Sequence, residues 1–211
     1  RSREQIGNLA HSLKTPLMAL QGMLPDDEAA QALIARMDRQ IGWHLKRARS
    51  AGGARVLGQI TRLDGVIDDI LLVLNQPLKD RAITVSRDLP AGMILQIEAE
   101  DAQEILGNLL ENAVKWARAR IVIRARPETG RVRLSICDDG PGMKDADHAR
   151  ALTRGIRLDE RGPGAGLGLA IVADLAALNG GGLTLGRDET LGGLAATVTL
   201  PGTPDGRGDP Q

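Results

Sequence analysis

The sequence predicts an α+β protein in which a helical hairpin precedes an α/β sandwich. Up to about residue 48, apolar residues recur at three- and four-residue steps, which is the pattern of amphipathic helices. From about residue 59 onward, helical segments alternate with short apolar runs that are typical of strands. Phe and Tyr are absent and only two Trp occur, so the core must be built from Leu, Ile, Val and Ala.

Two amphipathic helices joined by a short turn are expected first. The apolar stripe of the first helix consists of Ile6, Leu9, Leu13, Leu17, Leu20 and Leu24. The turn is expected at Pro25–Asp27, and the second helix ends at Gly52-Gly53. The stripe of this second helix consists of Leu33, Met37, Ile41, Leu45 and Ala48. Such a hairpin cannot cover its own apolar face, and we expect a two-fold dimer that forms a four-helix bundle.

One histidine stands out on the first helix because of the side it faces. At about 100° per residue, His11 and Thr15 point away from the apolar stripe, so His11 is expected to be solvated and accessible to another molecule. An exposed histidine alone is usually plain surface. Pro16, however, interrupts the helix one turn later, at a cost of about 3 kcal/mol or more. A helix bent at this point would present His11.

The remaining elements follow in alternation. Helices are expected over 59–78, 101–118 and 166–178, and strands over 83–86, 94–97, 121–125, 132–137, 183–185 and 195–200. The segment 138–165 has little apolar periodicity and many glycines, and the tail from about Thr203 onward is rich in Gly, Pro and Asp and is expected to be disordered. The expected domains are therefore a hairpin over 1–53, a sandwich over 54–203 and a tail over 204–211.

The composition excludes several classes of protein. Lys and Arg balance Asp and Glu at 27 each and are mixed along the chain, so neither a nucleic-acid footprint nor a polybasic membrane patch is present. The single cysteine, Cys137, excludes a disulfide framework and is expected to be a buried, inert thiol. No apolar run is long enough for a membrane span. Because the sequence begins at Arg1 rather than Met, we interpret it as a piece of a longer protein.

The helix predicted over 101–118 carries polar residues on one side. Asn108, Asn112 and Lys115 cluster within about 60° of each other, opposite the apolar face. Asn is a poor helix former, so two Asn one turn apart need a reason. An amide oxygen can ligate Mg²⁺, and an ammonium group can hold phosphate. The alternative interpretation is an ordinary solvated helix face.

An Asp-rich turn directly follows the strand expected over 132–137. In Asp138-Asp139-Gly140-Pro141-Gly142, the glycines Gly140 and Gly142 permit a backbone that other residues resist. Asp138 could accept a hydrogen bond from an exocyclic amine. The alternative is a plain tight turn, which Asp-Gly sequences often form.

A second glycine-rich stretch, Gly164-Ala165-Gly166-Leu167-Gly168-Leu169, opens the next helix. Glycines at a helix N-terminus let backbone N–H groups approach an anion, and the helix dipole favours phosphate there. The stretch is neither a complete GxGxxG fingerprint nor a P-loop. The long segment before it carries Arg154, Arg157 and Arg161, all capable of reaching a polyphosphate.

The four motifs together are more specific than any one of them. His-Ser-Leu-Lys-Thr-Pro-Leu from His11, Asn-Leu-Leu-Glu-Asn-Ala-Val-Lys from Asn108, Asp-Asp-Gly-Pro-Gly from Asp138 and Gly-Ala-Gly-Leu-Gly-Leu from Gly164 occur in this order. In order and spacing they resemble the sensor histidine kinases of two-component systems, most closely the PhoQ type. The resemblance covers roughly residues 3–201. It implies a dimerisation and phosphoacceptor hairpin followed by a GHKL-type ATP-binding domain.

That resemblance also implies roles for individual residues. His11 would be the phosphoacceptor, and Thr15 would orient water for dephosphorylation of a partner. Ser12 stands where most relatives carry an acid, and it can hydrogen-bond but cannot act as a base near neutral pH. The implied nucleotide site consists of Asn108, Asn112, Lys115, Asp138, Gly140, Gly142, Arg154, Gly164, Gly166, Leu167 and Gly168. Within it, Asn112 with Asn108 would hold Mg²⁺ on ATP, Lys115 and Arg154 would contact phosphate, and Asp138 would read the adenine amine.

The resemblance further implies the setting of the chain. The expected activity is ATP-dependent autophosphorylation on His11, phosphotransfer to an aspartate of a response regulator receiver domain, and phosphatase activity toward that partner. The expected assembly is a homodimer that forms the cytoplasmic portion of an inner-membrane sensor. Two alternatives remain open. One is a degenerate kinase that relays phosphate or acts as a scaffold, and the other is a GHKL ATPase without histidine kinase activity.

Overall fold

The computed structural model describes residues 60–152 and 168–204, together with nine isolated positions between 16 and 37. The chain divides into two compact units, Arg1–Leu57 and Gly58–Gln211. In the first unit, the described positions 16, 19, 20, 22 and 23 are helical, as are 30, 34 and 37. Between these groups, Oδ1 of Asp27 accepts a hydrogen bond of 2.9 Å from the backbone N–H of Ala30, which is an N-cap contact. The described positions on either side of Asp27 are thus helical, and Asp27 itself is in neither a helix nor a strand.

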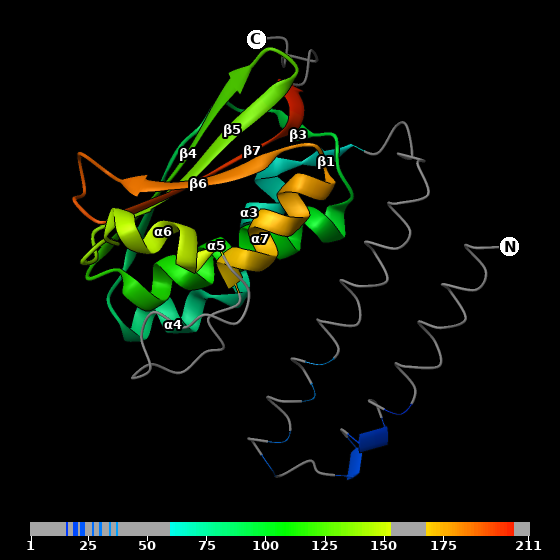
Figure 1. Ribbon diagram of the computed structural model, residues 1–211, viewed down its shortest axis with the longest axis vertical. Coiled ribbons are helices and arrows are strands. Elements are labelled where there is room, and N and C mark those ends of the chain that lie inside the picture. The colour runs from blue at the N-terminus through cyan, green and yellow to red at the C-terminus, as the bar shows by residue number, and fades with distance from the viewer. Residues whose placement is uncertain are drawn as a thin grey trace, which may run out of the picture. The chain divides into compact units, whose positions relative to one another are not determined.

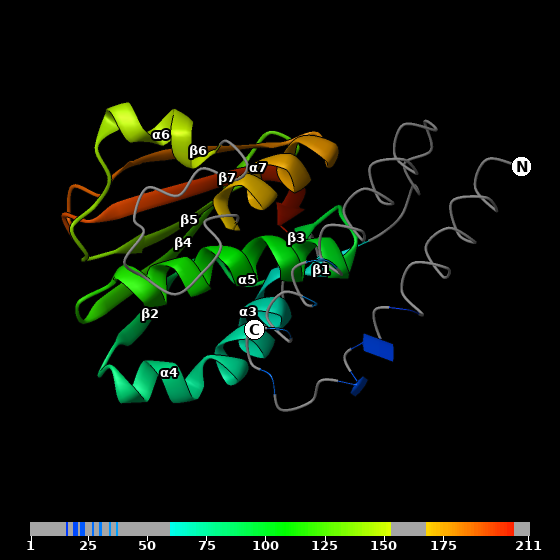
Figure 2. The ribbon, with the colours of Figure 1, turned by 60° about the horizontal axis from the view of Figure 1, so that its bottom comes forward.

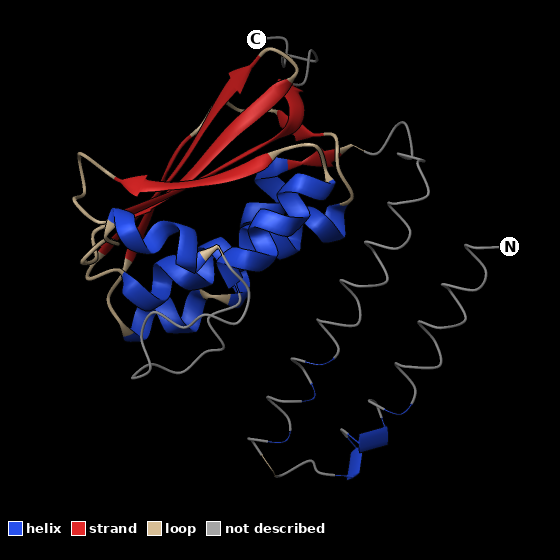
Figure 3. Cartoon of the chain, viewed as in Figure 1, coloured by secondary structure: helices blue, strands red, loops and turns tan. Residues whose placement is uncertain are grey.

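The second unit has one layer of strands and one layer of helices (Figures 1 and 3). Its strands are β1 (Thr61–Arg62), β2 (Thr84–Asp88), β3 (Met93–Leu95), β4 (Arg120–Glu128), β5 (Arg131–Asp138), β6 (Gly182–Arg187) and β7 (Leu194–Pro204). Their order in the sheet is β1-β3-β7-β5-β4-β2, and β6 pairs with the edge of β7 opposite β5. All pairs are antiparallel except β2 with β4, which is parallel. The sheet is therefore mixed, and β7 connects its two parts.

The helices lie on one face of this sheet (Figure 2). They are α3 (Leu63–Val73), α4 (Asn75–Asp80), α5 (Ala99–Trp116), α6 (Asp145–Ala151) and α7 (Gly168–Leu178). Alternate residues of the central strands are fully buried toward the helices, as Ile121 and Ile123 are on β4, because side chains alternate between the two faces of a strand. The largest of these core side chains are Leu, Ile and Met, as the absence of Phe and Tyr requires.

The long helix α5 ends at a point that other parts of the chain hold in place. The Arg81 guanidinium donates hydrogen bonds to the carbonyl oxygens of Val114 and Ala117, which are otherwise among the unpaired carbonyls of the helix end. The positive charge of an arginine near a helix C-terminus also interacts favourably with the negative end of the helix dipole. These contacts fix where α5 stops and β4 begins.

The sequence located most elements to within two or three residues, with three exceptions. One helix was expected over 59–78, but Thr61–Arg62 form the short strand β1 and pair with Leu95 and Ile94 of β3. The rest of that expected helix is divided at Leu74 into α3 and α4. The helix α6 was not expected, because its sequence lacks an apolar period. The expectation of a disordered tail from Thr203 is wrong for its first two residues, because Thr203 and Pro204 pair with β3.

None of the helices in residues 60–152 and 168–204 has both the length and the apolar character needed to cross a bilayer.

Candidate functional site

Asp138 is the last residue of β5 and is almost completely buried, with 2% of its surface exposed. Its Oδ1 accepts hydrogen bonds from the backbone N–H of Gly140, at 2.8 Å, and from that of Leu194 on β7, at 3.3 Å. Burial raises the pKa of Asp138, and these two N–H groups oppose the rise without cancelling it. The carboxylate is thus held in a fixed orientation in a poorly solvated place, where an added hydrogen-bond donor would be strongly favoured.

The turn after β5 depends on its two glycines. A Cβ atom at Gly140 would overlap the carbonyl oxygen of Trp116 at the end of α5 and would lie 2.8 Å from Oδ1 of Asp138. Gly142 adopts a φ of +74°, in the left-handed region that favours glycine. The sequence prediction that both positions need glycine is therefore explained by close approach at Gly140 and by backbone conformation at Gly142.

The neighbouring Asp139 has a structural role. Its Oδ1 accepts hydrogen bonds from the backbone N–H groups of Arg118, at 2.8 Å, and Ala119, at 3.1 Å. Partial burial acts to raise the pKa of Asp139, but the backbone N–H groups outweigh it and hold this pKa below the usual value. Asp139 therefore ties the α5–β4 turn to the end of β5, next to Asp138.

The loop between β6 and β7 closes over the same carboxylate. A Cβ atom at Gly193 would overlap the carbonyl oxygen of Asp138 and would lie 2.5 Å from its Oδ1 and 2.6 Å from the nitrogen of Gly140. Only glycine allows β7 to start this close to Asp138. Together with the Leu194 N–H, Gly193 belongs to the immediate surroundings of the carboxylate.

Asn108 on α5 faces the first residue of α7. Its Nδ2 donates a hydrogen bond of 2.7 Å to the carbonyl oxygen of Glu104, one turn earlier in the same helix. A Cβ atom at Gly168 would lie 3.1 Å from Oδ1 of Asn108. The amide oxygen is therefore directed at the start of α7. Asn112, one turn further along α5, is half-buried.

Lys115 lies in the last turn of α5 and is exposed. Its ammonium group lies 4.9 Å from the centre of the Trp116 ring, within the range of a cation–π contact. The positive charge also suits the C-terminal end of a helix.

The structure thus places Asp138, Gly140 and Gly142 together at one end of β5, and Asn108 next to Gly168. The remaining candidates lie outside the described residues, and these are His11, Ser12, Thr15, Arg154, Gly164, Gly166 and Leu167.

Neither Gly193 nor the backbone of Leu194 was predicted from the sequence to belong to the site. The only local signal was the Gly192-Gly193 pair immediately before a strand, which marks a turn and nothing more. That the turn meets Asp138 depends on how β7 pairs with β5, which a single sequence does not specify.

Residues 97–204 match the family described as histidine kinase-, DNA gyrase B-, and HSP90-like ATPase. The chain is 38% identical to the sensor protein kinase CarS of Pseudomonas aeruginosa over 98% of its own length and 48% of that protein. It is 37% identical to the two-component sensor PhoQ of the same species over 94% of its length and 46% of that protein. The chain therefore spans about half the length of these relatives.

Two solved structures show the same likeness in three dimensions. Full-length ShkA in complex with AMPPNP has a TM-score of 0.67 and 25% identity, covering 97% of this chain and 47% of the other. The mycobacterial sensor histidine kinase MprB has a TM-score of 0.62 and 27% identity, covering 70% of this chain and 99% of the other.

The matched region, 97–204, begins just before α5 and ends with β7, so it contains Asn108, Asp138, Gly140, Gly168 and Gly193. From this match and from the similarity to sensor kinases over nearly the whole chain, we conclude that the protein belongs to the family of histidine kinase-, DNA gyrase B- and HSP90-like ATPases.

Proposed function

We propose that this chain is the catalytic portion of a sensor histidine kinase, which uses ATP to phosphorylate His11 and passes the phosphoryl group to a response regulator. The observation that carries the proposal is the Asp138 carboxylate, which is buried and oriented by two backbone N–H groups at the end of β5. A carboxylate held in this way accepts a hydrogen bond from an amine such as that of adenine. The AMPPNP named in the ShkA structure supports a nucleotide as the ligand of this fold.

The residues around Asp138 supply the rest of a nucleotide site. Gly140 and Gly142 would shape the base pocket. The start of α7 at Gly168, with Gly164, Gly166 and Leu167 before it, would present backbone N–H groups to the phosphates. Lys115 and Arg154 would add positive charge.

Magnesium fits the donor atoms that α5 offers. Amide oxygens are among the hard ligands that this ion accepts, and Oδ1 of Asn108 is directed toward the start of α7, while Nδ2 is occupied within α5. Asn112, with Asn108, would hold the ion on the ATP phosphates. When bound, the ion would neutralise charge on the phosphate oxygens.

The phosphoryl transfer itself requires one nucleophile. The Nε2 lone pair of neutral His11 forms a bond to the γ-phosphorus while the bond from that phosphorus to the β–γ bridging oxygen breaks and ADP leaves. Ser12 would hydrogen-bond Nδ1, which leaves the proton of Nδ1 to solvent or buffer. Thr15 would orient water in the reverse task of dephosphorylating the partner.

The setting of the chain belongs to the same proposal. The names of its relatives, sensor protein kinase and two-component sensor, support a receiver domain as partner. We propose a homodimer formed through a four-helix bundle of two hairpins. We also propose that the chain is the cytoplasmic portion of an inner-membrane sensor.

Labelling with radioactive ATP tests the proposal. The chain is incubated with Mg²⁺ and γ-labelled ATP, and protein-bound label is tested for stability in alkali and loss in acid, the signature of phosphohistidine. We expect label in the wild type and none in His11→Gln. ATP turnover that does not depend on His11 would favour an ATPase without kinase activity. Transfer of label from a phosphorylated partner to His11, without labelling from ATP, would favour a phosphorelay protein.

A further inference from the structure

The loop between β6 and β7 is folded around one carboxylate. Oδ1 of Asp188 accepts hydrogen bonds from the backbone N–H groups of Thr190, at 3.1 Å, and Leu191, at 2.7 Å. Two backbone hydrogen bonds close the loop further, from Asp188 N–H to the Gly193 carbonyl at 3.0 Å and from Gly192 N–H to the Asp188 carbonyl at 2.8 Å. The conformation of residues 188–193 therefore depends on where the Asp188 side chain is held.

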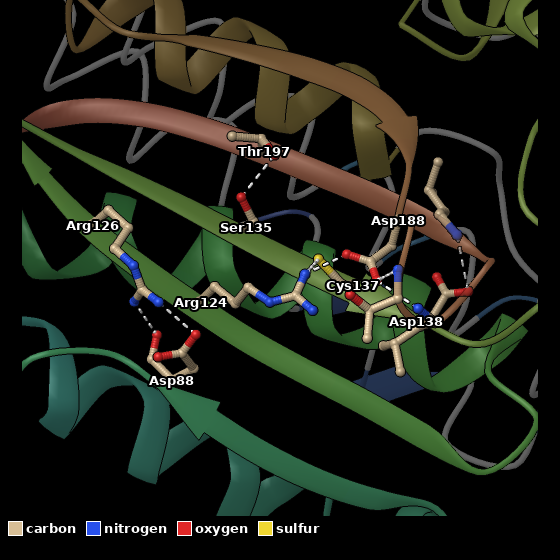
Figure 4. A network of polar contacts seen from close by, with 11 residues as sticks. Asp88, Arg124, Arg126, Ser135, Cys137, Asp138, Asp188 and Thr197 are labelled. Atoms are coloured by element: carbon tan, nitrogen blue, oxygen red, sulfur yellow. Dashed lines mark hydrogen bonds and ion pairs between the residues drawn. The ribbon is translucent and has the colours of Figure 1, made fainter.

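An arginine from the other side of β5 holds that side chain. Arg124 of β4 donates a hydrogen bond to Oδ2 of Asp188, and the same nitrogen lies 3.1 Å from Sγ of Cys137 on β5 (Figure 4). Only 28% of the Arg124 side chain and 7% of the Asp188 side chain are exposed. Although burial acts to raise it, the pKa of Asp188 is lowered to about 2 by Arg124, by the Leu191 N–H and by Cys137. Asp188 is thus charged and fully paired near neutral pH.

The same loop sets the surroundings of Asp138. Its last residue is Gly193, which has room for no side chain against Asp138, and the next N–H, from Leu194, donates to Oδ1 of Asp138. Asp188 and Asp138 are therefore connected through six residues of loop that have little freedom to move independently. A shift of Asp188 would move Gly193 and the Leu194 N–H relative to the carboxylate.

We infer that Arg124 and Asp188 are positioning residues for base recognition, holding the β6–β7 loop so that Asp138 meets the nucleotide base in one orientation. The inference rests on the proposed function, because it assigns a task in the nucleotide site. It adds two residues to that site, Arg124 on β4 and Asp188 directly after β6.

A neighbouring ion pair provides a matched control. Arg126, two residues further along β4, donates a hydrogen bond of 2.6 Å to Asp88 at the end of β2. Both side chains of this pair are about half exposed, at 53% and 54%. Like the Arg124–Asp188 pair, this pair joins an arginine of β4 to an aspartate. Asp88, however, lies on the opposite side of β4 from the β6–β7 loop.

The experiment compares nucleotides that differ at the group Asp138 would read. Dissociation constants are measured for Mg²⁺-ATP and Mg²⁺-ITP, since inosine carries a carbonyl oxygen in place of the adenine amine. For Arg124→Gln we expect ATP affinity to fall about tenfold while ITP affinity changes less than about twofold. Arg124→Lys, which can still pair with Asp188, should recover most of the ATP preference. Arg126→Gln should keep the wild-type ratio. Thermal unfolding establishes that each variant is folded at the temperature of measurement.

The outcomes separate this inference from the proposed function. A wild type that binds neither nucleotide would refute the proposed function and this inference with it. A wild type that prefers ATP, with an unchanged ratio in Arg124→Gln, would overturn the inference alone. If Arg124→Gln does not fold, Asp188→Asn, which keeps the shape of the side chain, should show the same loss of ATP preference. Failure of both variants to fold would assign the pair to stability only and would also overturn the inference.

Discussion

The amide oxygen of Asn108 lies so near Gly168 that a methyl group added at Gly168 would press against it and displace it by a few tenths of an ångström. A Cβ atom at Gly168 would lie 3.1 Å from Oδ1 of Asn108 and 3.7 Å from its Cβ. The contact joins the middle of α5 to the first residue of α7, and both residues come from motifs that the sequence analysis singled out.

Gly168→Ala should therefore affect ligand binding more than folding. Alanine is favoured over glycine in a helix by roughly 0.5–1 kcal/mol, which offsets part of the strain against Asn108. We expect the melting temperature to change little and ATP affinity to fall about three- to tenfold as Oδ1 of Asn108 is displaced. Gly65→Ala, on the exposed side of α3 with nothing within 4 Å of the new methyl, serves as control. It should stabilise the fold by about 0.5–1 kcal/mol and leave binding unchanged. Equal binding by both variants would contradict the proposed role of Asn108.

Asp138→Asn should stabilise the fold at neutral pH while it abolishes preference for adenine. The folded-state pKa of Asp138 is raised, so the stability associated with its protonated form is present below the unfolded-state pKa, near 4, and is lost as pH rises through the folded-state pKa. The amide carries no charge and escapes that loss, and its oxygen can still accept from Gly140 and Leu194. Urea unfolding at several pH values should give the variant a higher free energy of unfolding than the wild type at pH 7. Below about pH 4 the two free energies should be equal. A variant that is less stable than the wild type at pH 7 would contradict this, because it would mean that the charge of Asp138 does not destabilise the fold.

Asp188→Asn should have the opposite pH dependence. The folded-state pKa of Asp188, about 2, lies below the usual Asp value of 3.8. Its contribution to stability is therefore present above the unfolded-state pKa and is lost as pH falls from about 4 toward 2. At pH 7 the substitution should cost about 2 kcal/mol in the free energy of unfolding. The difference from wild type should shrink over that acidic range, measured by urea unfolding.

Asp88→Asn provides the comparison, because its ion pair with Arg126 is half exposed. It should cost less than about 1 kcal/mol. If the two substitutions cost the same, burial would not distinguish the two pairs.

Cys137 should resist alkylation in the folded protein. It is 1% exposed, and burial, reinforced by the nearby Asp188 carboxylate, raises its pKa to about 12. Because the thiolate is the reactive form, iodoacetamide at pH 8 should react about a thousandfold more slowly with native protein than with protein unfolded in guanidinium chloride. Mass spectrometry of the labelled chain follows both reactions. Rapid labelling under native conditions would mean that the contacts among Arg124, Cys137 and Asp188 open readily.

Thr15→Ala should separate the two activities of the hairpin. If Thr15 orients water, its loss should slow dephosphorylation of a receiver domain by about tenfold more than it slows autophosphorylation of His11. Thr15→Ser, which keeps the hydroxyl, should retain phosphatase activity. Both rates are followed with labelled phosphate on His11 and on a receiver domain that this chain phosphorylates. Equal phosphatase rates in the alanine variant and the wild type would refute the assignment.

Much of the sandwich could be predicted because its signals are local. The alternation along β4 and β5 and the helical period of α5 identify which side chains face the core, and the structure buries Ile121, Leu134 and Leu109 accordingly. The strand β1 and the helix α6 were missed because neither carries such a local signal. Two residues cannot show a period, and α6 is stabilised without an apolar stripe of its own.

The sequence by itself determined the α/β class of the second unit, the composition of its core and the motif residues Asn108, Asp138 and Gly140, since residue type and spacing within one segment carry that information. Only the tertiary structure showed that Leu194 donates to Asp138 from 56 positions away and that Arg124 holds Asp188 from 64 positions away. These pairs depend on the order and register of β4, β5, β6 and β7 in the sheet. Register between strands that are distant in sequence is set by packing of the whole sheet against its helices, so no local pattern can report it.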